Sequence, residues 1–183
     1  MQAYEVKEIN GIKVGILNCY EAEFPELNRI LTLKGAQMIL IPTAADVGTY
    51  DHHSKLWSNW AYPDVSRTII NANAYQNRVF CSYINHSLYQ FRSDGETMSG
   101  IYLGNSTVAD PMGETMVIAE NVETMLIADC IPSDYPPLHP EGQSDFIRDR
   151  RPELYAQLTS MSVVHNIDGS EHNYPVNANE RTD

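Results

Sequence analysis

The stretch IKVGILNCYEAEFPELNRILTLKGAQMILI, residues 12–41, contains the pattern that decides the fold. It starts with an apolar run at 12–17 and ends with a second one at 37–41, and both runs are typical of strands covered on two faces. Between them Pro25 is typical of a first helical turn, apolar residues follow at helical spacing, and Gly35 is typical of a helix end. Strand, helix and strand in this order predict a parallel crossover unit, so we expect an α/β fold.

Cys19 lies directly after the first of these strands. Crossover units place their active sites at the carboxyl ends of strands, and a sharp turn there exposes the side chain. The backbone N–H of Tyr20 would then point at a substrate oxygen, and the nearby helix N-terminus would stabilise a thiolate. A cysteine after an apolar strand is also often a buried and inert residue. Position alone leaves both interpretations open.

The rest of the chain reads as further strands, one more helix and polar segments. Asn10-Gly11 predicts a hairpin turn before the quoted stretch, and the turn at 110–113 predicts a second hairpin over 105–119. The other expected elements are a strand end at Pro42, a loop at 43–62, a helix at 63–77, a strand at 78–85, a polar loop at 86–100, a strand at 123–129, an extended segment at 133–144 and a short helix at 145–158.

Length and composition indicate one domain with a real core, because the chain has 183 residues and is 43% hydrophobic. We assign this domain to residues 1–158 and a polar tail to 159–183. The net charge of −12 argues against a nucleic-acid partner. No apolar run of about 18 residues predicts a membrane span. The first ten residues do not resemble a signal peptide, so we expect a cytoplasmic protein.

The three cysteines, Cys19, Cys81 and Cys130, are far apart in the sequence, and they form no CxxC pair. The spacing indicates neither a disulfide framework nor a zinc site, so reduced thiols are expected.

Several motifs together resemble the nucleophile segment and the later motifs of the nitrilase superfamily, the carbon–nitrogen hydrolases. The likeness spans about residues 4–158. The motifs are Cys19-Tyr20-Glu21, Phe24-Pro25-Glu26, Arg29, Gly35-Ala36, Pro42-Thr43-Ala44, Gly104-Asn105-Ser106 with Asp110-Pro111-Met112-Gly113, and Asp149-Arg150-Arg151-Pro152-Glu153-Leu154-Tyr155.

The resemblance implies part of a four-layer α-β-β-α sandwich and hydrolysis of a small non-peptide amide or nitrile, without a cofactor. It implies that Cys19 forms a thioester and that the Tyr20 N–H stabilises the oxyanion. Tyr after the cysteine resembles the amidase and carbamoylase branches more than true nitrilases. Candidate substrate contacts are Glu21, Thr43, Ala44 and Ala45.

In this family the general-base Glu and the catalytic Lys precede the cysteine strand. The 18 residues before Cys19 offer no match for them, so we expect the chain to be the C-terminal half of the sandwich. Half a sandwich exposes a sheet face, and this predicts a homo-oligomer or a missing N-terminal half as partner. The alternative is a catalytically inactive fragment with a structural or binding role.

Other interpretations of the polar and aromatic residues stay open. A Cys–His hydrolase would use His52, His53 or His86, and Asp51 with the first two could bind a metal, although we expect no metal site. Four aromatic residues could line a pocket or pack in a loop; they are Tyr50, Trp57, Trp60 and Tyr62.

Four positions relate to ion pairs. Asn73 and Gln76 stand where the family usually has Arg and Glu, which suggests a compensated helix. Glu21 and Arg29 could both have a functional role or form a structural ion pair and helix-capping contacts behind the nucleophile; the structural role is expected for Arg29, and both stay open for Glu21.

Overall fold

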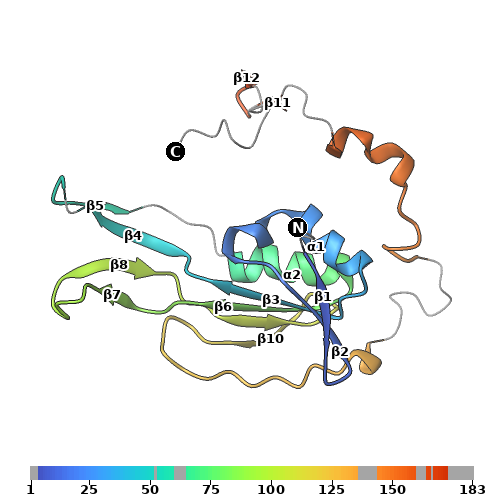
Figure 1. The fold of residues 1–183 in the computed structure, drawn as a ribbon, viewed down its shortest axis with the longest axis horizontal. Coiled ribbons are helices and arrows are strands. Elements are labelled where there is room, and N and C mark those ends of the chain that lie inside the picture. The colour runs from blue at the N-terminus through green and yellow to red at the C-terminus, as the bar shows by residue number, and fades with distance from the viewer. Residues whose placement is uncertain are drawn as a thin grey trace. The chain divides into compact units, whose positions relative to one another are not determined.

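The computed structural model describes residues 4–51, 53–59, 65–135, 144–159, 164–165 and 167–172. It divides the chain into two compact units, Met1–Ile147 and Arg148–Asp183. Both sheets described below lie in the first unit (Figure 1). The expected boundary between domain and tail after residue 158 stays a prediction.

The first hairpin joins β1 (Val6–Ile9) to β2 (Ile12–Ile16) in antiparallel register, as predicted. Its turn residues Asn10 and Gly11 have φ values of +50° and +82°. Positive φ at both central residues is the geometry of a type I′ turn, and Asn and Gly adopt it at low cost. The hairpin therefore follows from local sequence alone.

The predicted crossover unit is confirmed. Chain direction reverses twice through α1 (Pro25–Leu33), and β3 (Met38–Thr43) then lies parallel to β2. Pro42 does not end this strand, contrary to expectation, because it pairs with Ile84 of the next strand. On the β2 side of β3, the pairing ends at Leu40. Pro42 has no N–H to donate, but no strand lies beside it on the β2 side, so no ladder hydrogen bond is lost there.

The main sheet has six strands in the order β1-β2-β3-β6-β9-β10. The predicted second helix is α2 (Val65–Asn77) where described, and the strand after it is β6 (Phe80–Asn85), parallel to β3. The second predicted hairpin is also confirmed, with β9 (Thr107–Ala109) and β10 (Thr115–Ile118). The α/β fold class is therefore confirmed.

Both helices cover one face of this sheet (Figure 1). Side chains at Leu17, Ile39, Ile41 and Cys81 are completely buried there. A Cβ on Gly15 would lie 2.8 Å from the side chain of Leu31, so this glycine lets α1 approach β2 closely. The alternation of the strands sends the neighbouring residues to the opposite face.

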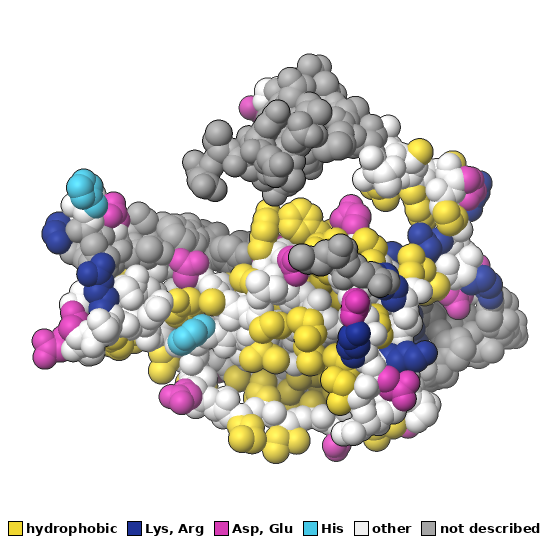
Figure 2. Space-filling view, in the orientation of Figure 1, with side chains coloured by type: hydrophobic (Ala, Val, Ile, Leu, Met, Phe, Trp, Pro, Cys, Tyr) yellow, Lys and Arg dark blue, Asp and Glu magenta, His cyan; other side chains and the backbone are white. Residues whose placement is uncertain are grey.

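The opposite face of the sheet is apolar and partly exposed, and we call it the open face. Ile16 and Ile84 are 58% and 51% exposed, although they belong to inner strands. Ile9, Val14, Ile16 and Leu40 line a hollow of about 520 Å³. Figure 2 shows hydrophobic side chains gathered at the centre of the view. This is the exposed sheet face that was expected for half a sandwich.

A second sheet of four antiparallel strands, in the order β5-β4-β8-β7, replaces the loops expected at 43–62 and 86–100. Its strands are β4 (Asp46–Asp51), β5 (Leu56–Asn59), β7 (Tyr89–Phe91) and β8 (Met98–Tyr102). Tyr89 and Phe91 of β7 are about half exposed. This strand therefore lacks the alternation of buried apolar and exposed polar residues by which a strand is predicted from sequence.

The expected strand at 123–129 is not formed. In the described ranges the chain pairs with no strand there. Of the helices in those ranges, none combines the length and the apolar character that crossing a bilayer requires.

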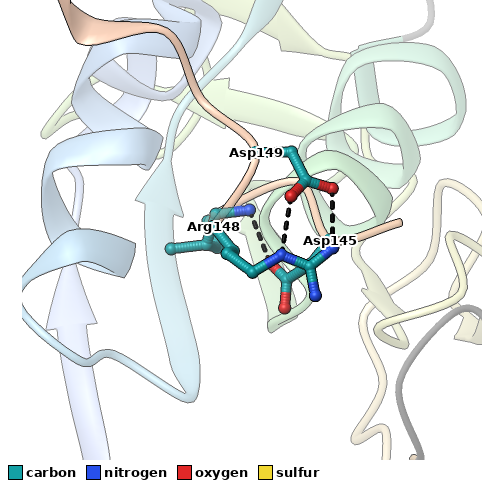
Figure 3. A network of polar contacts seen from close by, with 4 residues as sticks. Asp145, Arg148 and Asp149 are labelled. Carbon is teal, nitrogen blue, oxygen red and sulfur yellow. Dashed lines mark hydrogen bonds and ion pairs between the residues drawn. The ribbon is translucent and has the colours of Figure 1, made fainter. Parts of the chain in front are cut away.

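Short local contacts organise residues 144–159, in place of the expected regular helix. In the first unit the Asp145 carboxylate accepts the N–H of Ile147 at 2.8 Å, and in the second unit Arg148 donates to Asp149 at 2.6 Å (Figure 3). A 3-10 helix follows at Pro152–Thr159. Of the extended segment expected at 133–144, residues 136–143 lie outside the described residues.

Candidate active site

The candidate site lies at the carboxyl edge of three neighbouring parallel strands. The ladder between β2 and β3 pairs Ile16 with Leu40, and Leu17 N–H continues it by donating to Leu40 O at 3.0 Å. The two strands run in the same direction, so Cys19, which follows β2, and Thr43, which ends β3, lie at the same edge of the sheet. The turn that begins at Cys19 also contacts β3. The sheet therefore brings the predicted nucleophile and the predicted substrate segment to one edge.

Cys19 starts a short 3-10 helix, Cys19–Glu23, with a φ of +51°. A residue with a Cβ seldom adopts positive φ, and such backbone strain is concentrated at functional sites. The side chain is partly exposed and the thiol is free. The Tyr20 N–H has no hydrogen-bond acceptor among the described residues, since it is one of the first N–H groups of its helix. A thiol and an unpaired donor are thus adjacent at the turn.

The carboxylate of Glu21 stabilises this turn through two hydrogen bonds. One carboxylate oxygen accepts the Asn18 N–H at 2.8 Å and the other accepts the Tyr4 hydroxyl at 3.2 Å. Burial, followed by the charge and hydrogen bond of Glu21, raises the pKa of Tyr4. Both oxygens of Glu21 thus support the turn around Cys19, while its role as a substrate contact stays a prediction.

Two buried amides fix the other end of the same helix. Asn28 and Asn73 donate to the carbonyl of Ala22 at 3.0 and 2.9 Å. Asn73 therefore has a defined contact where the family usually has an arginine. Arg29 donates to the backbone carbonyl of Gln76 at 2.9 Å, which links α1 to α2 and agrees with the structural role expected for it.

The segment after β3 is fixed by the side chain of Asn85, at the end of β6. Asn85 accepts the Ala45 N–H at 2.9 Å and donates to Gly104 O at 2.8 Å. The Ala45 carbonyl accepts Leu103 N–H, so both backbone groups of Ala45 are occupied. Of the three predicted substrate contacts on this segment, Thr43 is half-buried and Ala44 is exposed, while Ala45 is buried.

The two described histidines that were considered as a base for Cys19, His53 and His86, have other contacts. His86 is exposed at the end of β6, two strands away from β2, and its ring stacks on Tyr102. His53 lies in the turn between β4 and β5, where its N–H donates to Asp51. His52 lies outside the described residues. In the parts of the chain that the structure describes, no group of three His, Cys, Asp or Glu side chains could hold a metal ion.

The aromatic residues considered for a pocket are only partly described. Trp57 lies on β5, is 38% exposed and pairs in register with Tyr50 of β4. Trp60 and Tyr62 lie outside the described residues. A pocket-lining role for these four residues stays a prediction.

The other two cysteines have environments that suppress their reactivity. Cys81 is completely buried, and burial raises the pKa of its thiol to about 12. Burial, together with the charge of Asp129, raises the pKa of Cys130. A higher thiol pKa means less thiolate at neutral pH, so both are poor nucleophiles.

Asn28 and Asn85 are supporting residues that sequence reasoning missed. An Asn inside a helix or at a strand end usually indicates an exposed turn or cap. Asn28 lies on the same helix face as Leu31, and this was the only signal that it points inward.

Comparison with known proteins gives a consistent result. A family model described as carbon-nitrogen hydrolase matches residues 1–138. A hydrolase in the pqqF 5′ region of Pseudomonas protegens is 31% identical over 158 residues, which cover 85% of this chain and 47% of the relative. The N-carbamoylputrescine amidase of Arabidopsis thaliana is 28% identical over 161 residues, covering 86% and 51%.

Solved structures agree with the sequence matches. A mutant of the amidase from Nesterenkonia sp. AN1, which shows Michael addition of acrylamide at the active site cysteine, superposes with a TM-score of 0.61 at 26% identity. The match covers 86% of this chain and 50% of that one. The chain thus spans about half the length of the relatives it matches.

Proposed function

Because the chain belongs to the carbon–nitrogen hydrolase family of the nitrilase superfamily, we propose that it carries the nucleophile of an amidase that hydrolyses a small non-peptide amide at Cys19. The observation that carries this proposal is the Cys19 turn, where a partly exposed thiol at positive φ precedes an unpaired Tyr20 N–H. The thiol and the donor are adjacent, as a covalent acyl transfer requires.

The proposed reaction has two steps. The Cys19 sulfur attacks the amide carbon while the Tyr20 N–H stabilises the oxyanion, and the carbon–nitrogen bond then breaks. The amine or ammonia leaves with a proton, and the acyl group remains as a thioester. Water attacks the thioester, the carboxylic acid leaves, and the thiol is restored. Thr43 and Ala44 lie at the same strand edge and are the proposed substrate contacts.

We propose that the general-base Glu and the Lys come from polypeptide outside the 183 residues. The support is that the chain covers 47–51% of the length of the curated relatives described above, and that the open face has the exposed apolar character of an unfilled interface. A homo-oligomer is the other arrangement that would cover this face. A cytoplasmic location agrees with three free thiols.

The nucleophile assignment is tested by covalent trapping. The chain is incubated with acrylamide at neutral pH, and peptide mapping by mass spectrometry measures the adduct at each cysteine. We expect the adduct on Cys19 ahead of Cys130 and Cys81. Cys81→Ser and Cys130→Ser are the matched controls and should leave the Cys19 adduct unchanged. Equal labelling of Cys19 and Cys130 would overturn the assignment. Full amidase activity of the Cys19→Ser chain, measured together with the polypeptide that supplies the Glu and the Lys, would also overturn it.

A further inference from the structure

Residues 123–131 belong to no sheet among the described residues, but part of the segment has the exposure pattern of a strand. From Met125 to Ile131 the exposure alternates: Leu126, Ala128 and Cys130 are partly buried, while Met125 and Ile127 are 82% and 79% exposed. Alternation with a period of two is the side-chain pattern of a strand. The segment therefore has two distinct faces.

The inner side of this segment faces the open face of the main sheet. Val122, Glu123, Thr124 and Leu126 line a hollow of about 670 Å³, together with residues of β6 and β9. The trace passes along the sheet without joining it (Figure 1). Its far end is anchored, because the ring of Tyr135 packs edge-on against Phe80 with ring centroids 5.2 Å apart.

The backbone of the segment is unpaired within the described structure. Val122 N–H bonds to Glu120 O at the start and Asp134 N–H to Ile131 O at the end, but residues 123–130 form no backbone hydrogen bond with the described residues. A row of free N–H and C=O groups beside alternating exposed side chains is a template for pairing with another strand.

We propose that residues 123–131 add as a strand to the edge of a β-sheet in the polypeptide that corresponds to the part of the relatives outside this chain. This inference rests on the proposed function, because it identifies how the missing part is bound. Pairing would satisfy the free backbone groups, and the partner's side chains would enter the hollow beside Leu126. The length of that missing part, about half of each relative, is sufficient for a sheet of its own.

Charge argues against a second copy of this chain as the occupant. Antiparallel pairing of two copies centred on Leu126 places Glu123 opposite Asp129, and parallel in-register pairing places each acid opposite itself. Like charges directly opposite each other destabilise a strand pair. The net charge of −12 adds to this repulsion.

The test is amide hydrogen exchange on the full chain, alone and fused. In the fusion, the part of the Pseudomonas protegens hydrolase outside the match precedes Met1 through a flexible Gly-Ser linker. We expect exchange at 123–131 to slow by at least about tenfold in the fusion. Ile127→Pro, which removes one N–H from an exposed position, should abolish that protection, and the control Ile127→Thr should keep it. Exchange in β3 and β6 reports whether each variant is folded.

Hydrolysis of a small amide by the same fusion separates this inference from the proposed function. Fast exchange at 123–131 in an active fusion overturns the strand proposal and leaves the function standing. Protection in an inactive fusion supports the strand proposal and counts against the function, and fast exchange in an inactive fusion counts against both. If residues 123–131 are protected in a dimer of the unfused chain, a second copy pairs with them, and the proposal that the partner is the polypeptide outside this chain is overturned.

Discussion

The carboxylate of Glu21 accepts a 2.8 Å hydrogen bond from the backbone N–H of Asn18, and so ties together the residues on either side of Cys19. The second oxygen of Glu21 accepts the Tyr4 hydroxyl. We expect Glu21→Ala to lower the free energy of unfolding by about 0.5–1.5 kcal/mol, because the half-buried Tyr4 hydroxyl and the exposed Asn18 N–H lose their acceptor. Urea unfolding measures this loss.

The positioning role of Glu21 also predicts an effect on Cys19 itself. Glu21→Ala should change the alkylation rate of Cys19 in the folded chain, while Glu21→Gln should restore most of it, since an amide can accept from Asn18 and donate to Tyr4. Glu26→Ala, an exposed carboxylate on α1, is the control. An alkylation rate that is the same in all four proteins would contradict the positioning role.

Cys81 and Cys130 should both need a higher pH for labelling than an ordinary thiol. With a pKa of about 12, Cys81 holds roughly one thiolate in ten thousand at pH 8, and the fraction rises only as pH approaches 12. Burial also raises the pKa of Cys130, so its labelling should start above the pH at which a free thiol reacts. Iodoacetamide labelling between pH 6 and 10, read by mass spectrometry, should therefore find Cys19 first. Labelling of Cys81 in the folded chain near neutral pH would be inconsistent with its burial.

The order of the elements around Cys19 could be predicted from the sequence, because each signal there is local. The Asn10-Gly11 turn, Pro25 at the start of α1 and the apolar runs of β2 and β3 all act within a few residues. The cysteine turn follows from them. The family motifs then indicated its role.

The second sheet and the state of residues 123–131 could not be predicted in this way. β4 and β8 pair across about fifty residues, and Tyr89 and Phe91 of β7 are half exposed, so no buried alternation marks them. The 123–131 segment has strand periodicity, but a strand needs a partner and periodicity does not say which chain supplies it. The supporting contacts of Asn28, Asn73 and Asn85 depend on the same kind of long-range packing.

Alanine substitutions at Gly95 and Gly104 distinguish the cost of backbone strain from the cost of a steric clash. Both have positive φ, +72° and +69°, but a Cβ on Gly95 meets nothing within 4 Å, whereas one on Gly104 would lie 2.6 Å from Asn121 Cα. We expect Gly95→Ala to cost about 1–2 kcal/mol from backbone conformation alone. Gly104→Ala should cost clearly more in thermal or urea unfolding, because the backbone of Asn121 must move. Equal costs would mean that the junction beside Asn85 is looser than its geometry indicates.

Asn73 should be more important to stability than its neighbour Gln76 on the same helix. Asn73→Ala leaves the buried Ala22 carbonyl with one donor instead of two and opens a small cavity, so we expect a loss of about 1–3 kcal/mol. Gln76→Ala is the matched control, since this side chain is exposed and alanine favours the helix. Urea unfolding of both variants makes the comparison. A neutral Asn73→Ala would show that Asn28 alone holds the turn behind Cys19.

The open face should drive self-association of the isolated chain, because packing its exposed isoleucines against a second copy removes apolar surface from water. Sedimentation equilibrium of the pure chain should show concentration-dependent association. Replacing Ile16 and Ile84 with lysine should weaken it by more than about tenfold, since each buried isoleucine contributes about 1.5–3 kcal/mol. Leu33→Lys is the control, because Leu33 is 45% exposed on α1, whose helix covers the other face. A wild-type chain that stays monomeric at high concentration would show that the face needs no cover, and this would weaken the case for a missing half.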